Sequence, residues 1–211
     1  MTDIAVVDYG MGNLRSVQQA LRKVAPEAHI VVTADPKQVA AADRVVFPGQ
    51  GAMPDCMREM DTLGLRSAVL QAARDKPFLG ICIGLQMLFE HSAEGDIPGL
   101  GILRGDVVRF ASNQHDVQGN KIKVPHMGWN QVHHAEHPLW SDIEQDARFY
   151  FVHSYHVRPQ DEQRVQGTSR YPADFVCAVA QDNLFAVQFH PEKSAATGLT
   201  LLRNFVDWDP V

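Results

Sequence analysis

The stretch Pro77-Phe78-Leu79-Gly80-Ile81-Cys82-Ile83-Gly84-Leu85-Gln86 decides the fold of this 211-residue chain. Its first five residues form a short apolar run, which is typical of a buried strand in a parallel sheet. The apolar residues that follow Gly84 predict a helix that ends near His91. Cys82 therefore stands at a sharp corner between strand and helix, and the glycines beside it permit the close backbone contacts of such a corner.

The corner favours a reactive cysteine. Its pattern is the G-x-S-x-G nucleophile elbow with sulfur in place of oxygen. We expect strained dihedral angles at Cys82, because the chain turns sharply there. Proteins retain such strain mainly at functional sites. The positive end of the following helix favours the thiolate, which is the nucleophilic form of the side chain. The alternative is a buried, inert cysteine between packing glycines, and a general base elsewhere in the chain would decide against it.

A candidate base lies near the carboxyl end, in Phe189-His190-Pro191-Glu192. His190 and Glu192 are two residues apart, so an extended segment would place both side chains on the same side. Pro191 between them favours such a segment. The carboxylate can then orient the imidazole while the imidazole takes the proton of a thiol. The alternative is a surface pair at the start of a helix, and the apolar strand expected before His190 weakens it.

The order of strands and helices predicts an α/β fold. Apolar runs and amphipathic helices alternate through the first half, which indicates a mostly parallel central sheet with right-handed crossovers and flanking helices. After residue 91, short strands with polar turns predict an antiparallel extension in the C-terminal half, within a single domain over residues 1–211. The extension should contain strands at 107–110, 121–124, 130–133 and 149–156, a hairpin about 182–183, and a final helix after Ser194.

A glycine-rich loop is expected close to Cys82. Ligands of parallel sheets bind beyond the carboxyl ends of the strands, and Pro48-Gly49-Gln50-Gly51 follows a predicted strand at 44–47. Its open backbone can direct N–H groups into a site as oxyanion donors, or it can be an ordinary turn from strand to helix. A second glycine pair, Gly10 and Gly12, is weak evidence for a nucleotide site, because Arg15 takes the third glycine position of that fingerprint.

Composition excludes several classes of protein. No apolar run approaches the ~20 residues of a membrane span, and the amino terminus has no signal-peptide pattern. Three cysteines without paired spacing favour a reducing compartment, so we expect the cytoplasm. A net charge of −6 without a basic block argues against nucleic-acid binding. His133, His134 and His137 match no metal-site spacing, so we expect them in a solvated loop.

Blocks along the whole chain resemble the class I glutamine amidotransferases. The blocks shared with that family are G-I-C-I-G-L-Q at 80–86 and F-H-P-E at 189–192. Five further blocks resemble one branch of it, HisH, the glutaminase subunits of imidazole glycerol phosphate synthase: D-Y-G-M-G-N-L-R-S (8–16), F-P-G-Q-G-A (47–52), P-H-M-G-W-N (125–130), Y-F-V-H-S-Y (150–155) and H-P-E-K-S (190–194). The resemblance implies a flavodoxin-like sheet.

The resemblance also implies an activity, the hydrolysis of L-glutamine to glutamate and ammonia through a thioester. Cys82 would be the nucleophile, His190 the group that moves the proton, and Glu192 the carboxylate that holds His190. Backbone N–H groups of Gln50 and Ile83 would stabilise the oxyanion, although the family often has Val at the position of Gln50. Four residues would hold the glutamine: Gly51, Gln86, Ser154 and Tyr155.

No metal or organic cofactor is implied, but a partner is. Ammonia would pass to a separate (β/α)₈-barrel synthase subunit of the HisF type, in a heterodimer that makes imidazole glycerol phosphate and an aminoimidazole carboxamide ribotide (AICAR) in histidine biosynthesis. Four residues match the interface with that subunit: Trp129, Asn130, Tyr150 and Lys193. The alternatives are the glutaminase of another amidotransferase, a free-standing cysteine hydrolase, or a flavodoxin-like binding module with an oxidisable cysteine.

Overall fold

The computed structural model describes residues 2–111, 119 and 121–210. Its helices and 3₁₀ turns are α1 (Leu14–Val24), α2 (Pro36–Ala41), α3 (Met53–Thr62), α4 (Arg66–Asp75), α5 (Ile83–Met87), η1 (Pro138–Trp140), η2 (Glu162–Arg164), η3 (Pro191–Lys193) and α6 (Ala195–Asp207). Its strands are β1 (Asp3–Val7), β2 (His29–Thr33), β3 (Arg44–Gly49), β4 (Phe78–Cys82), β5 (Phe89–Ser92), β6 (Ile97–Pro98), β7 (Leu103–Arg109), β8 (His126–His134), β9 (Ala147–His153), β10 (Tyr155–Pro159), β11 (Val165–Arg170), β12 (Asp174–Gln181) and β13 (Leu184–Val187).

The described strands join in one sheet, in the order β2-β1-β3-β4-β13-β12-β10-β7-β5-β6, with β11, β8 and β9 branching from β12. The strands from β2 to β13 pair in parallel. Beyond β13 the pairing turns antiparallel through β12, β10 and β7. The predicted α/β sheet with an antiparallel extension in its C-terminal half is therefore confirmed.

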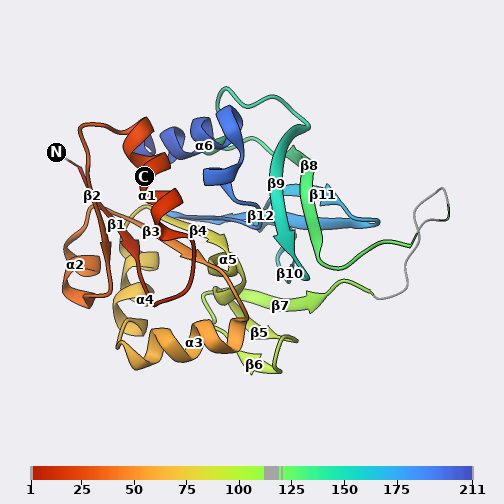
Figure 1. Ribbon diagram of the computed structural model, residues 1–211, viewed down its shortest axis with the longest axis horizontal. Helices are drawn as coiled ribbons and strands as arrows, with labels where there is room; N and C mark the ends of the chain where they lie inside the picture. The colour runs from red at the N-terminus through yellow and green to blue at the C-terminus, as the bar shows by residue number, and fades with distance from the viewer. Residues whose placement is uncertain (1, 112–118, 120, 211) are drawn as a thin grey trace.

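Helices cover both faces of the parallel part. In Figure 1, α1 and α6 lie above these strands, and α3 and α4 lie below them. α1 packs on α6, and α2 packs on α4. Because both faces are covered, side chains on either side of a strand are buried, and Ile4, Val45 and Leu79 are fully buried examples. This double coverage explains the continuous apolar runs in the sequence.

The helix that follows Cys82 is shorter than predicted. It ends at Met87 rather than near His91, and the next residues form β5. The segment after Pro98 explains the early end, because it takes the carbonyl groups that a further helical turn would use. The N–H of Leu100 donates to the oxygen of Met87 at 2.8 Å, and the N–H of Gly101 donates to that of Phe89 at 3.1 Å.

The antiparallel extension differs from prediction at two places. The predicted strand at 121–124 is wrong, since only Lys121 makes an isolated bridge there. Ile122 and Val124 are only half-buried, and Val124 packs against the core from a bend and not from a strand. The aromatic strand at 149–156 divides at Ser154, and β9 pairs with β8 while β10 pairs with β7 and β12. The division places Ser154 at a junction between two parts of the sheet.

Candidate active site

Cys82 adopts the strained corner conformation that the sequence predicts. Its φ is 57° and its ψ is −110°, and it precedes the first turn of α5. Packing explains why glycines flank it. A Cβ at Gly84 would collide with the carbonyl oxygen of Phe47, and a Cβ at Gly80 would lie 2.9 Å from the Cβ of Ala186. The strain therefore persists because the surrounding core leaves the corner no other arrangement.

His190 and Glu192 form the predicted pair. Nδ1 of His190 lies 2.8 Å from Oε1 of Glu192, and their side chains are only 4% and 2% exposed. The predicted extended segment is wrong, because residues 191–193 form the 3₁₀ turn η3. Pro191 takes the first helical position, where its fixed φ and missing N–H cost nothing, and the N–H of Lys193 closes the turn on the carbonyl of His190 at 3.0 Å.

Electrostatics favour a proton on His190 while Cys82 carries negative charge. Burial of His190 lowers its pKa, but negative charge on Cys82 and the hydrogen bond to Glu192 outweigh burial and raise the pKa to about 10. Nδ1 is occupied by the carboxylate, so its proton is fixed there. Among the described residues, Nε2 of His190 has no hydrogen-bond partner. Nε2 is therefore the nitrogen that is free to exchange a proton with Cys82 or a substrate.

A cavity of about 220 Å³ joins the two side chains. Cys82 and His190 both line it, while Glu192 lies behind His190. The six residues predicted to bind the oxyanion or the glutamine also line it: Gln50, Gly51, Ile83, Gln86, Ser154 and Tyr155. Together with Cys82 and His190, these residues come from four separate segments of the chain, so the fold brings together every predicted residue of the pocket.

The glycine-rich loop is held from the core. Gly49 is the register partner of Cys82 in the pairing of β3 with β4. The buried Tyr9 hydroxyl donates to the carbonyl of Pro48 at 2.8 Å. The thiol of Cys56 donates to the carbonyl of Gln50 at 3.6 Å. Two carbonyl groups of the loop therefore have partners on the protein side.

Ile83 supplies the second candidate oxyanion donor. It is the first residue of α5, so its N–H has no partner within the helix. Ile83 and Gln50 line the same cavity as Cys82. Backbone N–H groups at a helix start also carry the positive end of the helix dipole, which suits a developing negative charge.

Gln188 was not predicted from the sequence. Its side chain is fully buried, and its Nε2 donates to Sγ of Cys82 at 3.7 Å. Its Oε1 accepts from Nε2 of Gln86 at 3.0 Å, and the same nitrogen donates to the carbonyl of Tyr155 at 3.1 Å. Gln188 thus supports the nucleophile and one wall of the pocket. The local signal that could have found it is a polar residue inside the apolar run 184–189.

Glu94 was also missed. It lines the cavity, and its Oε2 accepts from the N–H of Met53 at 2.9 Å. A carboxylate at the rim suits the ammonium group of an amino acid. The sequence places Glu94 in a loop without any motif, so no local signal could have found it.

The residues predicted to meet a partner lie outside the cavity. Trp129 on β8 is 50% exposed and contacts Tyr150 of β9 edge to face, with centroids 6.2 Å apart; Met127, which was not predicted to meet a partner, is 62% exposed on the same strand. The carbonyl of Tyr150 accepts from the N–H of His190 at 2.9 Å. One backbone hydrogen bond therefore links β9, at Tyr150, to the backbone of His190. Lys193 follows Glu192 directly in η3.

Cys56, Cys177 and the three clustered histidines lie outside the cavity. Burial raises the pKa of Cys56 to about 12 and that of Cys177 further. The predicted solvated loop is wrong for His133 and His134, which lie in β8. His137 is also not solvated, because its ring packs on Phe185 with centroids 4.7 Å apart.

Within residues 2–111, 119 and 121–210, no group of three or more His, Cys, Asp or Glu side chains is arranged to hold a metal ion. In the same part of the chain, no helix is long and apolar enough to cross a membrane.

Known proteins resemble this chain over most of its length. The family model Glutamine amidotransferase class-I matches residues 5–208. Imidazole glycerol phosphate synthase subunit HisH of Nitrosospira multiformis is 67% identical, over 100% of both chains. HisH of Dechloromonas aromatica is 64% identical, over 98% of this chain and 97% of its own. PurLQS from Thermotoga maritima covers 98% of each chain with a TM-score of 0.73; at 18% identity it shows the fold alone.

Proposed function

Because the chain belongs to the class-I glutamine amidotransferase family, and within it to the HisH glutaminase subunits of imidazole glycerol phosphate synthase in histidine biosynthesis, we propose that Cys82, His190 and Glu192 perform its glutamine hydrolysis. The cavity shared by Cys82, His190 and the six predicted pocket residues carries this proposal. Residues 1–211 act as one domain, since β4 before Cys82 and β13 before His190 are neighbours in the sheet.

The first half-reaction forms a thioester. Sγ of Cys82, whose proton has passed to Nε2 of His190, attacks the side-chain amide carbon of L-glutamine. His190 then gives this proton to the amide nitrogen as the carbon–nitrogen bond breaks, and ammonia leaves. Glu192 stays ionised and holds Nδ1–H, so that the ring keeps its orientation throughout.

The second half-reaction releases glutamate. A water molecule attacks the thioester carbon while Nε2 of His190 takes one of its protons. The carbon–sulfur bond breaks, His190 returns the proton to sulfur, and the Cys82 thiol is restored. In both halves the carbonyl oxygen becomes negative, and the N–H groups of Gln50 and Ile83 stabilise it. Removal of one such donor typically costs about 10²–10³-fold in rate.

The rest of the pocket holds the amino-acid end of the substrate. Gly51, Gln86, Ser154 and Tyr155 surround it, and the carboxylate of Glu94 pairs with its ammonium group. The cavity of about 220 Å³ suits a small amino acid. The three buried thiols fit the reducing cytoplasm expected from the sequence.

The ammonia is used by a second subunit. HisH is by name a subunit of imidazole glycerol phosphate synthase, so this chain works with a synthase subunit. We propose that this partner is a (β/α)₈ barrel of the HisF type, in a heterodimer, and that it forms imidazole glycerol phosphate and AICAR. Four residues on or beside the exposed side of β8 and β9 would meet it: Trp129, Asn130, Tyr150 and Lys193.

A glutamine-analogue electrophile tests the nucleophile. It should label Cys82 and leave Cys56 and Cys177 free, since burial raises the pKa of both of these thiols. The adduct is located by mass spectrometry of proteolytic peptides, with Cys82→Ser as the matched control. An adduct on Cys56 or Cys177 in the native protein would contradict the assignment.

A further inference from the structure

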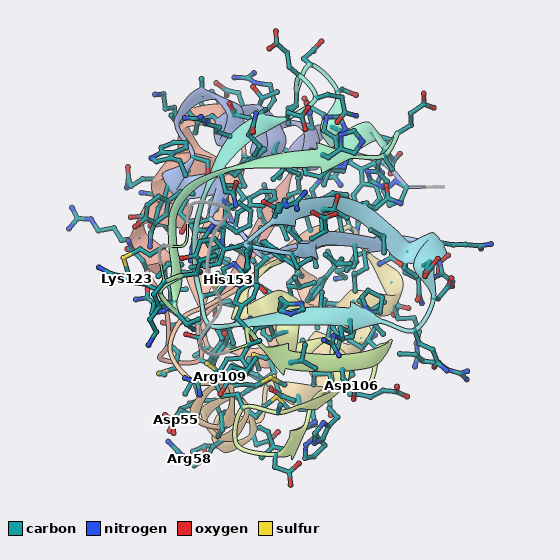
Figure 2. All side chains as sticks on the ribbon, turned by 90° about the vertical axis from the view of Figure 1, so that its right-hand side faces the viewer. Asp55, Arg58, Asp106, Arg109, Lys123 and His153 are labelled. Carbon is teal, nitrogen blue, oxygen red and sulfur yellow. The ribbon has the colours of Figure 1, made fainter. Side chains whose placement is uncertain are left out.

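A chain of hydrogen bonds runs from the half-buried Asn130, on the inner side of β8, to the glutamine pocket. Nδ2 of Asn130 lies 3.3 Å from Nε2 of His126. Nδ1 of His126 lies 3.0 Å from Nε2 of His153. Nδ1 of His153 lies 2.7 Å from the carbonyl oxygen of Tyr155. His153 is labelled in Figure 2, and it lines the cavity that contains Cys82.

The two ends of this chain fix every proton in it. A carbonyl only accepts, so Nδ1 of His153 carries a proton, and in a neutral ring Nε2 is then an acceptor. Nδ1 of His126 must therefore donate to it, which leaves Nε2 of His126 to accept. The amide nitrogen of Asn130 only donates, and this is the group that Nε2 faces. The orientation of that amide is set independently, because it also donates to the carbonyl of Arg170 at 2.9 Å.

This chain of hydrogen bonds forms only when the rings of His126 and His153 are both neutral. A second proton on His153 would place two N–H groups against each other between the rings, and a second proton on His126 would place its Nε2–H against the amide N–H of Asn130. The surroundings keep the rings neutral, since both are buried, at 3% and 5% exposure. Burial lowers the pKa of His126 to about 4 and that of His153 to about 3. The ring of His126 also stacks on Tyr171, with centroids 4.0 Å apart.

The inner end of the chain holds the rim of the pocket. The carbonyl of Tyr155 accepts from both His153 and Nε2 of Gln86, so both of its lone pairs are used. The carbonyl of Ser154 accepts from the N–H of Phe110 at 3.0 Å. Both rim carbonyls are therefore bound on the protein side and do not repel the carboxylate of an amino acid.

We propose that Asn130, His126 and His153 form a relay of two neutral Nδ1–H histidines that positions the Ser154–Tyr155 rim for glutamine. The proposal rests on the proposed function, because it assigns a task at that same pocket. The three residues are positioning residues and touch neither the reacting atoms nor Cys82. Their effect should therefore fall on the binding of glutamine rather than on the chemical step.

NMR of ¹⁵N-labelled histidine side chains tests the relay without any activity measurement. In the native chain at pH 7, His126 and His153 should both be neutral with the proton on Nδ1. Asn130→Asp replaces a donor by an acceptor at Nε2 of His126, so it should move the proton of that ring to Nε2. Nε2–H tautomers at both rings of the native chain would overturn the proposal.

Glutamine kinetics with the synthase subunit and its ribotide ligand test the positioning role. His126→Phe keeps the stacked ring and removes the hydrogen bonds, and it should raise the KM for glutamine about 10-fold with kcat little changed. His126→Asn keeps a donor near the place of Nδ1 and should restore most of the affinity. His156→Phe is the matched control, because His156 lies in the same aromatic cluster and outside the relay; its KM should stay native.

Two outcomes distinguish a failure of the positioning role from a failure of the proposed function. Equal KM values for His126→Phe and His156→Phe, both folded by circular dichroism, would overturn the positioning role. Nδ1–H tautomers in a chain that hydrolyses no glutamine with its partner would contradict the proposed function and leave the relay itself standing.

Discussion

The corner that carries Cys82 and the β8–β9 strands beside His190 are built in opposite ways. Every residue of β4 and α5 is buried, and the backbone around Cys82 is fixed by contacts that leave no room for a Cβ at Gly84. β8 alternates between buried and exposed residues, and its exposed side carries Trp129. The proposed nucleophile, Cys82, is thus held by the core, whereas the backbone of the proposed base, His190, is bound to strands whose outer side is exposed.

This contrast suggests a division of labour. The rigid corner holds Sγ of Cys82 in a fixed position, on a residue with strained backbone dihedral angles. The β8–β9 strands hold His190 through the carbonyl of Tyr150 and hold the glutamine rim through the relay from Asn130. A partner that binds these strands therefore has a route to the base and the rim that does not pass through the backbone of Cys82.

The largest effect is expected at the corner itself. Cys82→Ala should lower glutamine-dependent synthesis by the complete enzyme at least about 10⁴-fold, because nothing else in the pocket can form the thioester. Synthesis from added ammonium salt should stay native, since that route bypasses the glutaminase. Glutamine-dependent turnover that survives in Cys82→Ala would show that the nucleophile is elsewhere.

Replacement of His190 should lower the rate of glutamine hydrolysis more than replacement of Glu192 behind it. His190→Asn should cost about 10²–10⁴-fold in kcat for glutamine hydrolysis, the usual range for loss of a general base. Glu192→Gln should cost less, because the amide can still accept from Nδ1–H while only its charge is lost. Steady-state glutamate release compares the two, and similar residual rates would mean that their roles are misassigned.

The rigidity of the corner can be tested through stability. Gly84→Ala forces a Cβ into the backbone carbonyl of Phe47 and should lower the free energy of unfolding by roughly 1–3 kcal/mol. Gly80→Ala meets a side-chain methyl instead, that of Ala186, and should cost less. Urea unfolding measures both. A native-like midpoint for Gly84→Ala would show that the corner is not packed as described.

These two regions also differ in what the sequence reveals. The Cys82 corner is predictable because its determinants, Gly80 and Gly84, are neighbours in sequence. The pairing of His190 with Glu192 is predictable from spacing, although Pro191 starts a 3₁₀ turn and not an extended segment. The polarity of Gln188 within an apolar run is visible in the sequence, but its contact with Cys82 spans more than 100 residues of chain and cannot be seen in either segment.

The helix after Cys82 is shorter than predicted because it also depends on a contact with a segment outside it. Its sequence remains apolar to Phe89, but the segment at 99–103 takes its carbonyl groups. The division of the aromatic strand at Ser154 likewise depends on which strands are available to pair with each half. Local pattern therefore predicts the nucleophile, while long-range pairing decides how the pocket around it is closed.

A smaller effect is expected on the open side of β8. Trp129→Ala should weaken binding of the synthase subunit by about 2 kcal/mol, roughly 30-fold in Kd, if this exposed ring is an anchor of the interface. Its effect on the stability of the isolated chain should be small, because the side chain is half exposed. Calorimetric titration with the synthase subunit measures the Kd, and His133→Ala is a control on the same strand, away from the Trp129–Tyr150 contact. Unchanged affinity would remove Trp129 from the interface.

Glutamate release in three states tests most directly whether the β8–β9 strands control the site. The rate is measured for this chain alone, with the empty synthase subunit, and with that subunit plus its ribotide ligand. A change from about 1% to 99% competent sites needs roughly 5.5 kcal/mol of differential binding, which an interface between subunits can supply. Slow release by the chain alone and fast release with the loaded partner is the predicted result. Equal rates in all three states would contradict the account and would indicate a free-standing hydrolase.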